Sequence, residues 1–458
     1  IVSADGLVMT NHHVARGQLA KLSTRERDII TNGFLARSRA EEVKCPDLEV
    51  LSLQDIVDVT DRVDGAVVPG MSNAQAEDAR RAAIASIERE FNEKTGLFCQ
   101  VVALYGGGMH HVYCYKRYTD VRLVFAPEES IAAFGGDVDN FEFPRYCLDV
   151  TFLRLYENGE PAKPSHHFNF TLEGVRDGEP VFVTGHPGRT QRSFTVEHLR
   201  TLRDNLYPEW MDFTRRREVE LNVFASQGEE FQTQAYRELP SVENTRKGLG
   251  GKLVALQDPR NFQKKVREEE ELKSAIQSNP ALGETVLAAF DQIAQAQRVY
   301  DEIADRHNVL ERWPVGRSEL FGIARTIVRL TEERTKPNEQ RMAGFTESRI
   351  PTLELALYSP APIFPELEMN RVESGLTMAA DILGGEDKVV QTLFGGLGAN
   401  ERARQLVAGS RLADVGERQR LVEAGVEAVR ASDDPMIQLA LAIDGEARAV
   451  RKRFEEDV

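Results

Sequence analysis

The sequence predicts a β + α protein built from more than one domain. As far as about residue 165, short runs of β-branched and aromatic residues alternate with turn-forming Gly, Pro and Asn, which is the pattern of β-strands. From residue 197 to residue 458, apolar residues instead recur at the three- and four-residue spacing of α-helices. A chain of 458 residues is also longer than one ordinary hydrophobic core requires, so two or three domains are expected.

The β-rich part is expected to contain six strands and one helix. The helix covers residues 73–94, because apolar side chains there fall on one face and charged ones on the other. The strands are expected at Leu7–Thr10, Glu49–Thr60, Phe98–Tyr105, His111–Tyr118, Val121–Ala126 and Asp149–Tyr156.

Strand-like sequence resumes from Gly174 to Phe194, with a run at residues 179–188 that ends in Gly-His-Pro-Gly. In the helical part, Asn279-Pro280 is a helix start signal, and Gly384 and Gly395 are expected to end helices. The chain is therefore divided into residues 1–165 with the helical insertion 73–94, residues 166–196, and residues 197–458.

Composition excludes several classes of function. A formal net charge of −16 argues against binding of nucleic acid through its phosphates. No run approaches the about 18 apolar residues of a membrane-spanning helix. Of the four cysteines, Cys99 and Cys114 lie at equal distances from Gly106-Gly107, a suitable hairpin turn, and so would face each other across two strands. They form either a cross-strand disulfide, which fits an oxidising compartment, or two buried thiols.

The residues with the clearest chemistry lie close to the start of the chain. In Thr10–Val14, with sequence Thr-Asn-His-His-Val, the second histidine, His13, is our candidate for a general base, because imidazole can take and return a proton near neutral pH. Asp149 opens a later strand, where apolar neighbours should draw it inward and leave it in need of a partner such as His13. The chain order His, Asp, Ser is that of a chymotrypsin-like peptidase, yet no Gly-x-Ser-Gly turn occurs in the sequence.

A Gly-rich loop, Phe134–Phe141, carries two carboxylates and an amide. Asp137 and Asp139 lie inside this loop and rank below Asp149 as partners of a catalytic histidine. From its residues alone the loop could bind calcium, bind a positively charged amine, or form a capped turn. The paired histidines at 110–111 and 166–167 have no further ligand at suitable spacing, so no metal site is expected.

Together these motifs resemble the bacterial family of dipeptidyl-peptidases 7 and 11, which are serine exopeptidases. The resemblance covers nearly all of the first 260 residues and continues less distinctively through the helical part. Its most specific string is Phe-Gly-Gly-Asp-x-Asp-Asn followed by an aromatic residue. The other matching strings are Thr10–Val14, Thr31–Phe34, Ser38–Glu42, Asp58–Val63, Asp120–Val124, the rest of Phe134–Arg145, Val181–Gly188 and Glu243–Gly248.

The resemblance implies a chymotrypsin-like double β-barrel with a large α-helical domain inserted into the second barrel. Residues 1–165 would form the first barrel, residues 166–196 the first strands of the second, and residues 197–458 the helical lid. It further implies a periplasmic or secreted enzyme, often a homodimer, that removes dipeptides from peptides with free amino termini and needs no metal or organic cofactor.

Residue by residue, the family's base corresponds to His13 and its carboxylate to Asp149. The groups that hold the free amine of the substrate correspond to Asn140, Phe141 and Asn244. An ammonium group offers three N–H donors on a positive centre, which amide oxygens and an aromatic wall can bind.

The sequence departs from the family at several places. Phe141 occupies a position where many relatives carry Trp, and Val14 replaces a cysteine that commonly follows the paired histidines. The nucleophilic serine and the residue that selects the cleaved side chain would lie beyond Val458. We therefore expect the chain to be a segment of a longer protein that lacks both ends, and to be inactive by itself.

Two other functions fit parts of the pattern. A catalytically inactive, peptide-binding or chaperone-like pseudoprotease would keep the amine site and the lid but lack a nucleophile. An endopeptidase of the stress-protease type shares the Thr-Asn-x-His-Val string, but it usually lacks so large a helical insertion.

Overall fold

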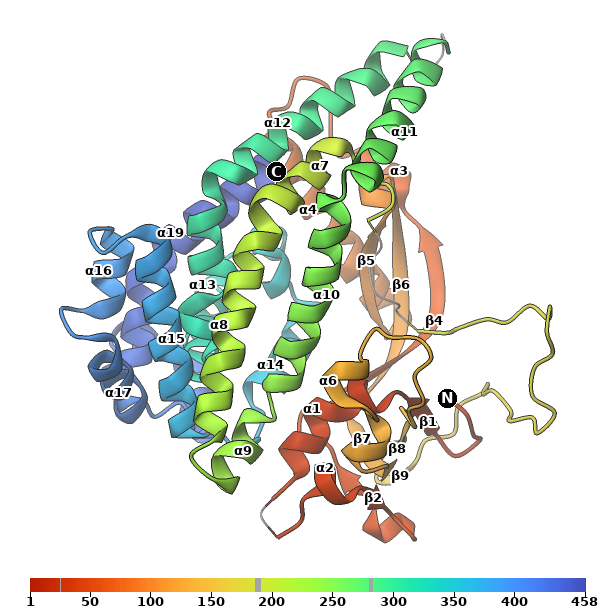
Figure 1. Cartoon of the computed structure of the whole chain (residues 1–458), viewed down its shortest axis with the longest axis vertical. Helices are drawn as coiled ribbons and strands as arrows, with labels where there is room; N and C mark the ends of the chain where they lie inside the picture. The colour runs from red at the N-terminus through yellow and green to blue at the C-terminus, as the bar shows by residue number, and fades with distance from the viewer. Residues whose placement is uncertain (25, 186–190, 280–282) are drawn as a thin grey trace.

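The computed structural model describes residues 1–24, 26–185, 191–279 and 283–458. Two sheets and the helices packed on them make up residues 1–165, and a larger all-helical part follows (Figure 1). The β + α organisation expected from the sequence is therefore present, and the six expected strands all form within two residues of their predicted ends.

The first sheet has the strand order β1-β8-β7-β2, with β3 also paired to β7 and β9 to β8. Within the described residues, all strand pairs of this sheet are antiparallel. Its inner face packs on α1 and α2 through a core that contains Leu19, Leu123 and Leu155. The bounds are β1 Leu7–Thr10, α1 His12–Leu22, α2 Ile29–Asn32, β2 Phe34–Leu35, β3 Val43–Lys44, β7 Asp120–Ala126, β8 Thr151–Glu157 and β9 Glu160–Pro161.

The second sheet has the order β4-β6-β5 and is also antiparallel. The strands are β4 Val50–Asp58, β5 Phe98–Leu104 and β6 Met109–Tyr118, and the short helix α3 is Thr60–Asp64. Helix α4, Asn73–Thr95, packs Ile87 and Phe91 against this sheet, as its amphipathic sequence predicts. Ser72 and Gln75 form a capping box at its start, which satisfies two backbone N–H groups there.

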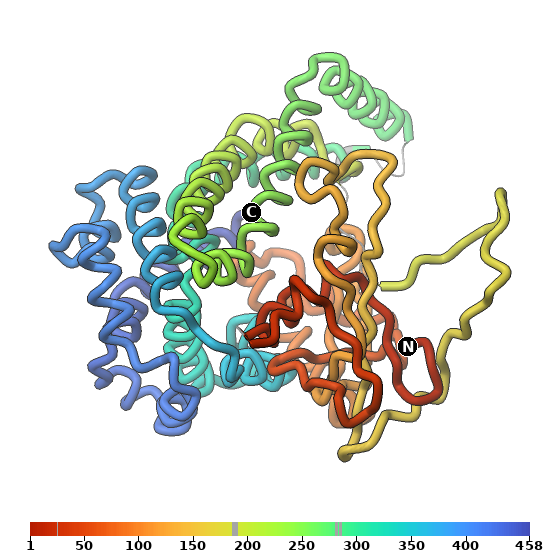
Figure 2. The backbone as a smooth tube through the Cα atoms, turned by 60° about the horizontal axis from the view of Figure 1, so that its bottom comes forward, coloured from red at the N-terminus to blue at the C-terminus, as the bar shows by residue number. Residues whose placement is uncertain are grey.

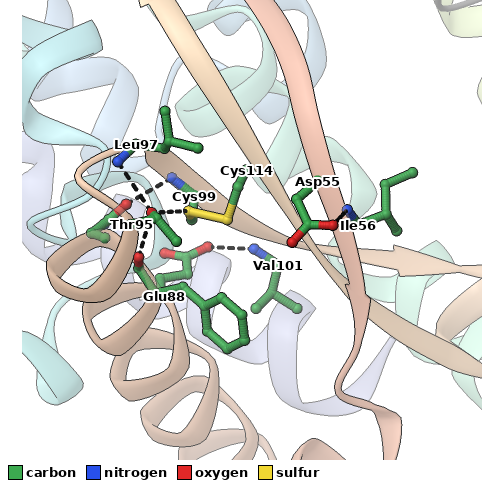
Figure 3. The surroundings of a disulfide bond; sticks show 10 residues. Asp55, Ile56, Glu88, Thr95, Leu97, Cys99, Val101 and Cys114 are labelled. Atoms are coloured by element: carbon green, nitrogen blue, oxygen red, sulfur yellow. Dashed lines mark hydrogen bonds between the residues drawn. A yellow bond between two sulfur atoms is a disulfide. The ribbon is translucent and has the colours of Figure 1, made fainter.

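Strands β5 and β6 carry the one disulfide among the described residues. Cys99 and Cys114 are opposite each other in the strand register and are bonded, S–S 2.13 Å. Figure 3 shows the bond beside Thr95 of α4, whose hydroxyl lies 3.4 Å from the Cys99 sulfur. The connecting loop has four residues, 105–108, instead of the predicted two-residue turn, since Leu104 pairs with Met109.

The strands expected between Gly174 and Phe194 do not form in the described residues of that stretch. Residues 174–185 have no strand partner, and Val181, Phe182 and Val183 are exposed. A strand needs a neighbour to pair with its backbone groups, so strand-forming side chains alone do not produce one here. Figures 1 and 2 both show residues 166–185 as part of a long excursion away from the other elements. Residues 186–190, which include Gly-His-Pro-Gly, lie outside the described part.

The helical part begins at Val196, one residue before the predicted boundary. Its largest apolar core lies among α13, α15 and α16–α19. Gly384 follows the last residue of α15 and Gly395 that of α16, as predicted, while Pro280 of the expected start signal lies outside the described residues. The helices are α7 Val196–Thr201, α8 Tyr207–Ala225, α9 Glu229–Ala235, α10 Leu239–Gln257, α11 Pro259–Gln277, α12 Gly283–His307, α13 Glu319–Glu333, α14 Ile350–Leu357, α15 Pro365–Leu383, α16 Lys388–Phe394, α17 Ala399–Gly409, α18 Val415–Arg430 and α19 Pro435–Asp457.

In the described part of the chain, no helix combines the length and the apolar character that crossing a membrane requires. Helix α10 lies beside the short helix α6, Gly136–Asp139, of the β-rich part (Figure 1). This contact brings residues more than a hundred positions apart to one place.

Candidate active site

The two adjacent histidines lie in the first turn of helix α1, directly after strand β1. Asn11 occupies the cap position, and His12 and His13 are the first two helical residues. Successive helical residues point about 100° apart, so one histidine turns inward and the other outward. His12 is buried, with 1% of its side chain exposed, whereas 59% of the His13 side chain is exposed.

Strand pairing places Asp149 next to His13. In the antiparallel register of β1 and β8, Thr10 lies opposite Thr151, so the residues just after Thr10 face those just before Thr151. The Asp149 Oδ2 atom lies 2.6 Å from His13 Nδ1, and its Oδ1 atom accepts the backbone N–H of His13 at 3.0 Å. Asn11 donates its side-chain amide to Asp149 Oδ2 at 3.3 Å. Asp149 thus lies at the wall of a cleft, 31% exposed, and not in the core as its apolar neighbours suggested.

The Asp149 carboxylate caps helix α1 and also orients the ring of His13. The Asn11 side chain makes no capping bond, so Asp149 supplies the acceptor for a free N–H group at the start of the helix. Burial raises the pKa of Asp149, but hydrogen bonds from the backbone and ring of His13 outweigh it and hold the pKa below its usual range. An ionised carboxylate only accepts hydrogen bonds, so this contact favours the tautomer of the neutral His13 ring in which the proton is on Nδ1 and the lone pair on Nε2.

The buried His12 has a different environment. Its Nδ1 atom lies 3.4 Å from Glu129 Oε2, and Glu129 also pairs with Arg16 at 3.0 Å. Burial lowers the pKa of His12, and Glu129 only partly opposes this effect. His12 therefore packs inside the domain, and His13 is the histidine that faces the cleft.

The Gly-rich loop meets helix α10 at Asn140. The Asn140 amide nitrogen donates to Asn244 Oδ1 at 2.9 Å, and Arg145 donates to Asn140 Oδ1, also at 2.9 Å. Phe141 has a left-handed backbone, φ 64°, and is exposed. A Cβ atom placed on Gly248 of α10 would lie 3.4 Å from the edge of the Phe141 ring, so the ring rests against the helix at this glycine. Asn140, Phe141 and Asn244 therefore lie together, as the resemblance implies.

The two other aspartates of the loop do not contact His13. Asp137 pairs with Arg246 of α10 at 2.8 Å, and its backbone oxygen accepts from Lys247 Nζ at 2.7 Å. Asp139 is not among the residues that line the cleft. Among the three candidate carboxylates, only Asp149 bonds to the histidine.

These groups line one large cleft between the β-rich part and the helical part. The cleft has a volume of about 1070 Å³. His13 and Asp149 lie on its β-rich wall together with Asn140, and Asn244 lines it from α10. Glu243 also lines it, and burial together with the nearby Asp137 and Glu218 raises the pKa of Glu243.

Several polar residues of this site were not predicted from the sequence. Arg145 orients Asn140, and Arg246 and Lys247 tie the loop to α10. A signal for the last two was present, because they follow Asn244 closely and the resemblance already placed Asn244 at the amine site with Asn140 and Phe141.

The whole sequence, residues 1–458, matches the family described as Peptidase S46. The chain belongs to the peptidase S46 family. The S46 relatives include dipeptidyl-peptidase 7 of Phocaeicola vulgatus, which is 35% identical over 216 residues, 44% of this chain and 30% of that protein. An Asp/Glu-specific dipeptidyl-peptidase of Shewanella putrefaciens is 27% identical over 476 residues, which cover 96% of this chain and 62% of the relative. The chain thus spans less than two thirds of the length of either relative.

Solved S46 structures share the fold. Porphyromonas endodontalis DPP11 in complex with the dipeptide Arg-Glu matches with a TM-score of 0.73 at 22% sequence identity, covering 99% of this chain and 67% of that one. The complex of the same protein with Arg-Asp also matches with a TM-score of 0.73, at 21% identity. The arrangement of sheets and helices described above is therefore that of an S46 peptidase.

Proposed function

We propose that this protein is a serine-type dipeptidyl peptidase, which releases dipeptides from the free amino terminus of peptides. The observation that carries the proposal is the 2.6 Å contact between His13 Nδ1 and Asp149 Oδ2 at the wall of the cleft. An imidazole held in this tautomer presents Nε2 as a general base, and the carboxylate stabilises the imidazolium that forms when Nε2 takes a proton.

The position of the nucleophile follows from the same geometry. A serine hydroxyl must lie within hydrogen-bond reach of His13 Nε2 to give up its proton. No residue of the described ranges bonds to Nε2, so the triad needs a serine from elsewhere. We therefore expect residues 1–458 alone to give no turnover.

Asn140, Asn244 and Phe141 would bind the free amine of the substrate. Arg145 donates to Asn140 Oδ1, and the Asn140 amide nitrogen donates to Asn244 Oδ1. Each of these two oxygens then has a second lone pair that can accept from an ammonium group. The Phe141 ring would form an apolar wall beside that group. An amine held at a fixed distance from the nucleophile sets the length of the released product at two residues.

The finer architecture is part of the same proposal. The two sheets of residues 1–165 would form the first barrel of a chymotrypsin-like pair, residues 166–196 would begin the second, and residues 197–458 would form the lid. A periplasmic or secreted location is supported by the Cys99–Cys114 disulfide, since such bonds persist mainly in oxidising compartments.

The test uses chromogenic dipeptidyl substrates, with free and with acetylated amino termini, and the protein in the length that its gene encodes. A panel with acidic and apolar residues at the cleaved position would establish the side-chain preference. We expect turnover of free-amine substrates only, abolished in His13→Ala. Turnover that is equal for acetylated substrates would overturn the dipeptidyl assignment, and turnover that persists in His13→Ala would overturn the role of His13.

A peptide-binding pseudoprotease is the second candidate, because the described residues provide an amine site but no nucleophile at His13. It predicts that the gene-length protein binds free-amine peptides and cleaves none of them. Measurable cleavage excludes it.

A further inference from the structure

A second cavity of about 310 Å³ lies within the helical part, between α8, α10, α15 and the turn Pro314–Arg317, called η5. Three aromatic residues form one part of its wall: Trp210 and Phe213 come from α8, and Trp313 immediately precedes η5. Most of the other lining residues are polar or charged. The Phe213 and Trp313 rings are stacked, with centroids 4.7 Å apart and planes at 2°. Such a cavity offers a planar ring extensive contact.

One buried hydrogen-bond donor of this cavity lacks an acceptor. The indole Nε1–H of Trp210 is buried and has no partner among the described residues. A buried donor without an acceptor is costly, and a ligand that brings an acceptor removes this cost. The side chain of Arg317 also lines the cavity but is exposed; its guanidinium lies 5.8 Å from the centre of the Phe213 ring and makes no hydrogen bond or ion pair within the described ranges.

The other charges that line the cavity are already paired. Glu238 accepts from Arg217 at 2.6 Å and from Arg371 at 2.9 Å. Arg371 also pairs with Glu368 at 2.8 Å and with Glu319 at 2.9 Å. Among the charged residues of the lining, Arg317 is therefore the one without a hydrogen-bonded or ion-pair partner in the described ranges, and Glu238 acts on it only through space.

The backbone holds Arg317 at the cavity in an unusual conformation. Val315, Gly316 and Arg317 all have positive φ, at 41°, 65° and 60°. A Cβ atom on Gly316 would lie 1.9 Å from the Arg371 backbone oxygen, and one on Gly375 would lie 2.1 Å from the Gly316 nitrogen. Close packing of η5 on α15 thus imposes the left-handed backbone, and strain that packing maintains in this way concentrates at functional sites.

We propose that this cavity is a binding site for a small aromatic carboxylate. The ring would lie against Trp210, Phe213 and Trp313, and the carboxylate would accept hydrogen bonds from Arg317. Guanidinium groups bind carboxylates in a bidentate manner. Ser241 of α10 lines both this cavity and the large cleft, but Asn140, Asn244 and His13 do not line it. The site is therefore separate from the proposed amine site.

Tryptophan fluorescence reports on this cavity, because both tryptophans of residues 1–458 line it. The gene-length protein is titrated with 3-phenylpropanoate, with the neutral 3-phenylpropan-1-ol and with hexanoate. We expect a saturable change with the aromatic acid, and binding about tenfold weaker for the alcohol. No saturable change, or equal binding of acid and alcohol, would overturn the proposal. Hexanoate binding as tight as that of the aromatic acid would overturn the aromatic requirement.

Variants identify where the acid binds. Arg317→Ala removes an exposed, unpaired side chain and should weaken binding of 3-phenylpropanoate about tenfold or more. Arg404→Ala, an exposed arginine of α17 that does not line the cavity, is the matched control and should not change binding. Asn244→Ala should also leave binding unchanged. A loss in Asn244→Ala with none in Arg317→Ala would place the acid in the large cleft and refute the site.

Discussion

Replacing Asp149 by Asn perturbs the proposed base with almost no change in shape. The present carboxylate accepts from the His13 backbone N–H with Oδ1 and faces His13 Nδ1 with Oδ2. An asparagine that keeps its oxygen on the backbone N–H turns its NH₂ group toward Nδ1. This places the ring proton on Nε2, where no base remains. The reversed amide points its NH₂ group at the backbone N–H instead. Neither orientation reproduces the present bonds.

The expected cost in activity is large. In His-Asp-Ser peptidases this exchange lowers turnover by about 10⁴-fold through the wrong tautomer, which corresponds to about 5 kcal/mol in the activation free energy. The 2.6 Å contact between the His13 ring and the Asp149 carboxylate at the wall of the cleft belongs to the same class. The free energy of unfolding should fall by only about 1 kcal/mol, because Asp149 also caps α1.

The assay measures kcat and KM of the gene-length protein on a chromogenic dipeptidyl substrate with a free amine, and measures Tm on the same samples. Asp139→Asn is the matched control, since Asp139 lies in the neighbouring loop but does not line the cleft. We expect kcat to fall about 10⁴-fold in Asp149→Asn and to change less than about twofold in Asp139→Asn. A loss below about tenfold in Asp149→Asn, with Tm unchanged, would refute the reasoning.

Three further predictions concern the amine site, the partly buried carboxyl group of Glu209 and the disulfide. Asn140→Ala should lower kcat/KM for free-amine substrates about 10- to 100-fold, because a hydrogen bond to a charged group is lost. The reaction of the serine with small acylating inhibitors should not change. An equal loss of both would mean that the loop is structural. Burial and the adjacent Asp305 raise the pKa of Glu209 to about 7. Once the pH exceeds the pKa that the Glu209 carboxyl has in the unfolded chain, Glu209 therefore destabilises the fold increasingly as the pH rises toward 7. Glu209→Gln should raise the free energy of unfolding, measured with urea, by about 1–2 kcal/mol at pH 8 and leave it unchanged at pH 4. Replacing Cys99 and Cys114 together by Ser opens a disulfide that spans 15 residues and should cost about 3 kcal/mol in the same measurement; an unchanged midpoint would show that the bond does not form in solution.

The pairing of His13 with Asp149 could be predicted from the sequence because local signals place both residues next to strand ends. Thr10 and Thr151 end and begin neighbouring strands, and antiparallel pairing then brings the adjoining residues together. The contact between Asn140 and Asn244 has no such local signal, since they lie 104 residues apart in different parts of the fold. Only resemblance to a family predicted that contact.

Other features depend on packing that a sequence pattern does not contain. The run Val181–Val183 has strong strand-forming residues, yet it finds no partner strand among the described residues and stays irregular and exposed. The cavity at Arg317 depends on the close approach of Gly316 and Gly375, which belong to elements far apart in the chain. Their spacing gave no indication that the two glycines would meet.

The most direct measurement follows the products of an unmodified ten-residue peptide by mass spectrometry, with the gene-length protein and its His13→Ala variant. We expect stepwise release of dipeptides from the free amino terminus by the unaltered protein. We expect no release by the variant, since loss of a triad member lowers turnover by about 10⁶-fold. Cleavage inside an amino-terminally acetylated peptide, or dipeptide release that His13→Ala leaves intact, would contradict the proposed function.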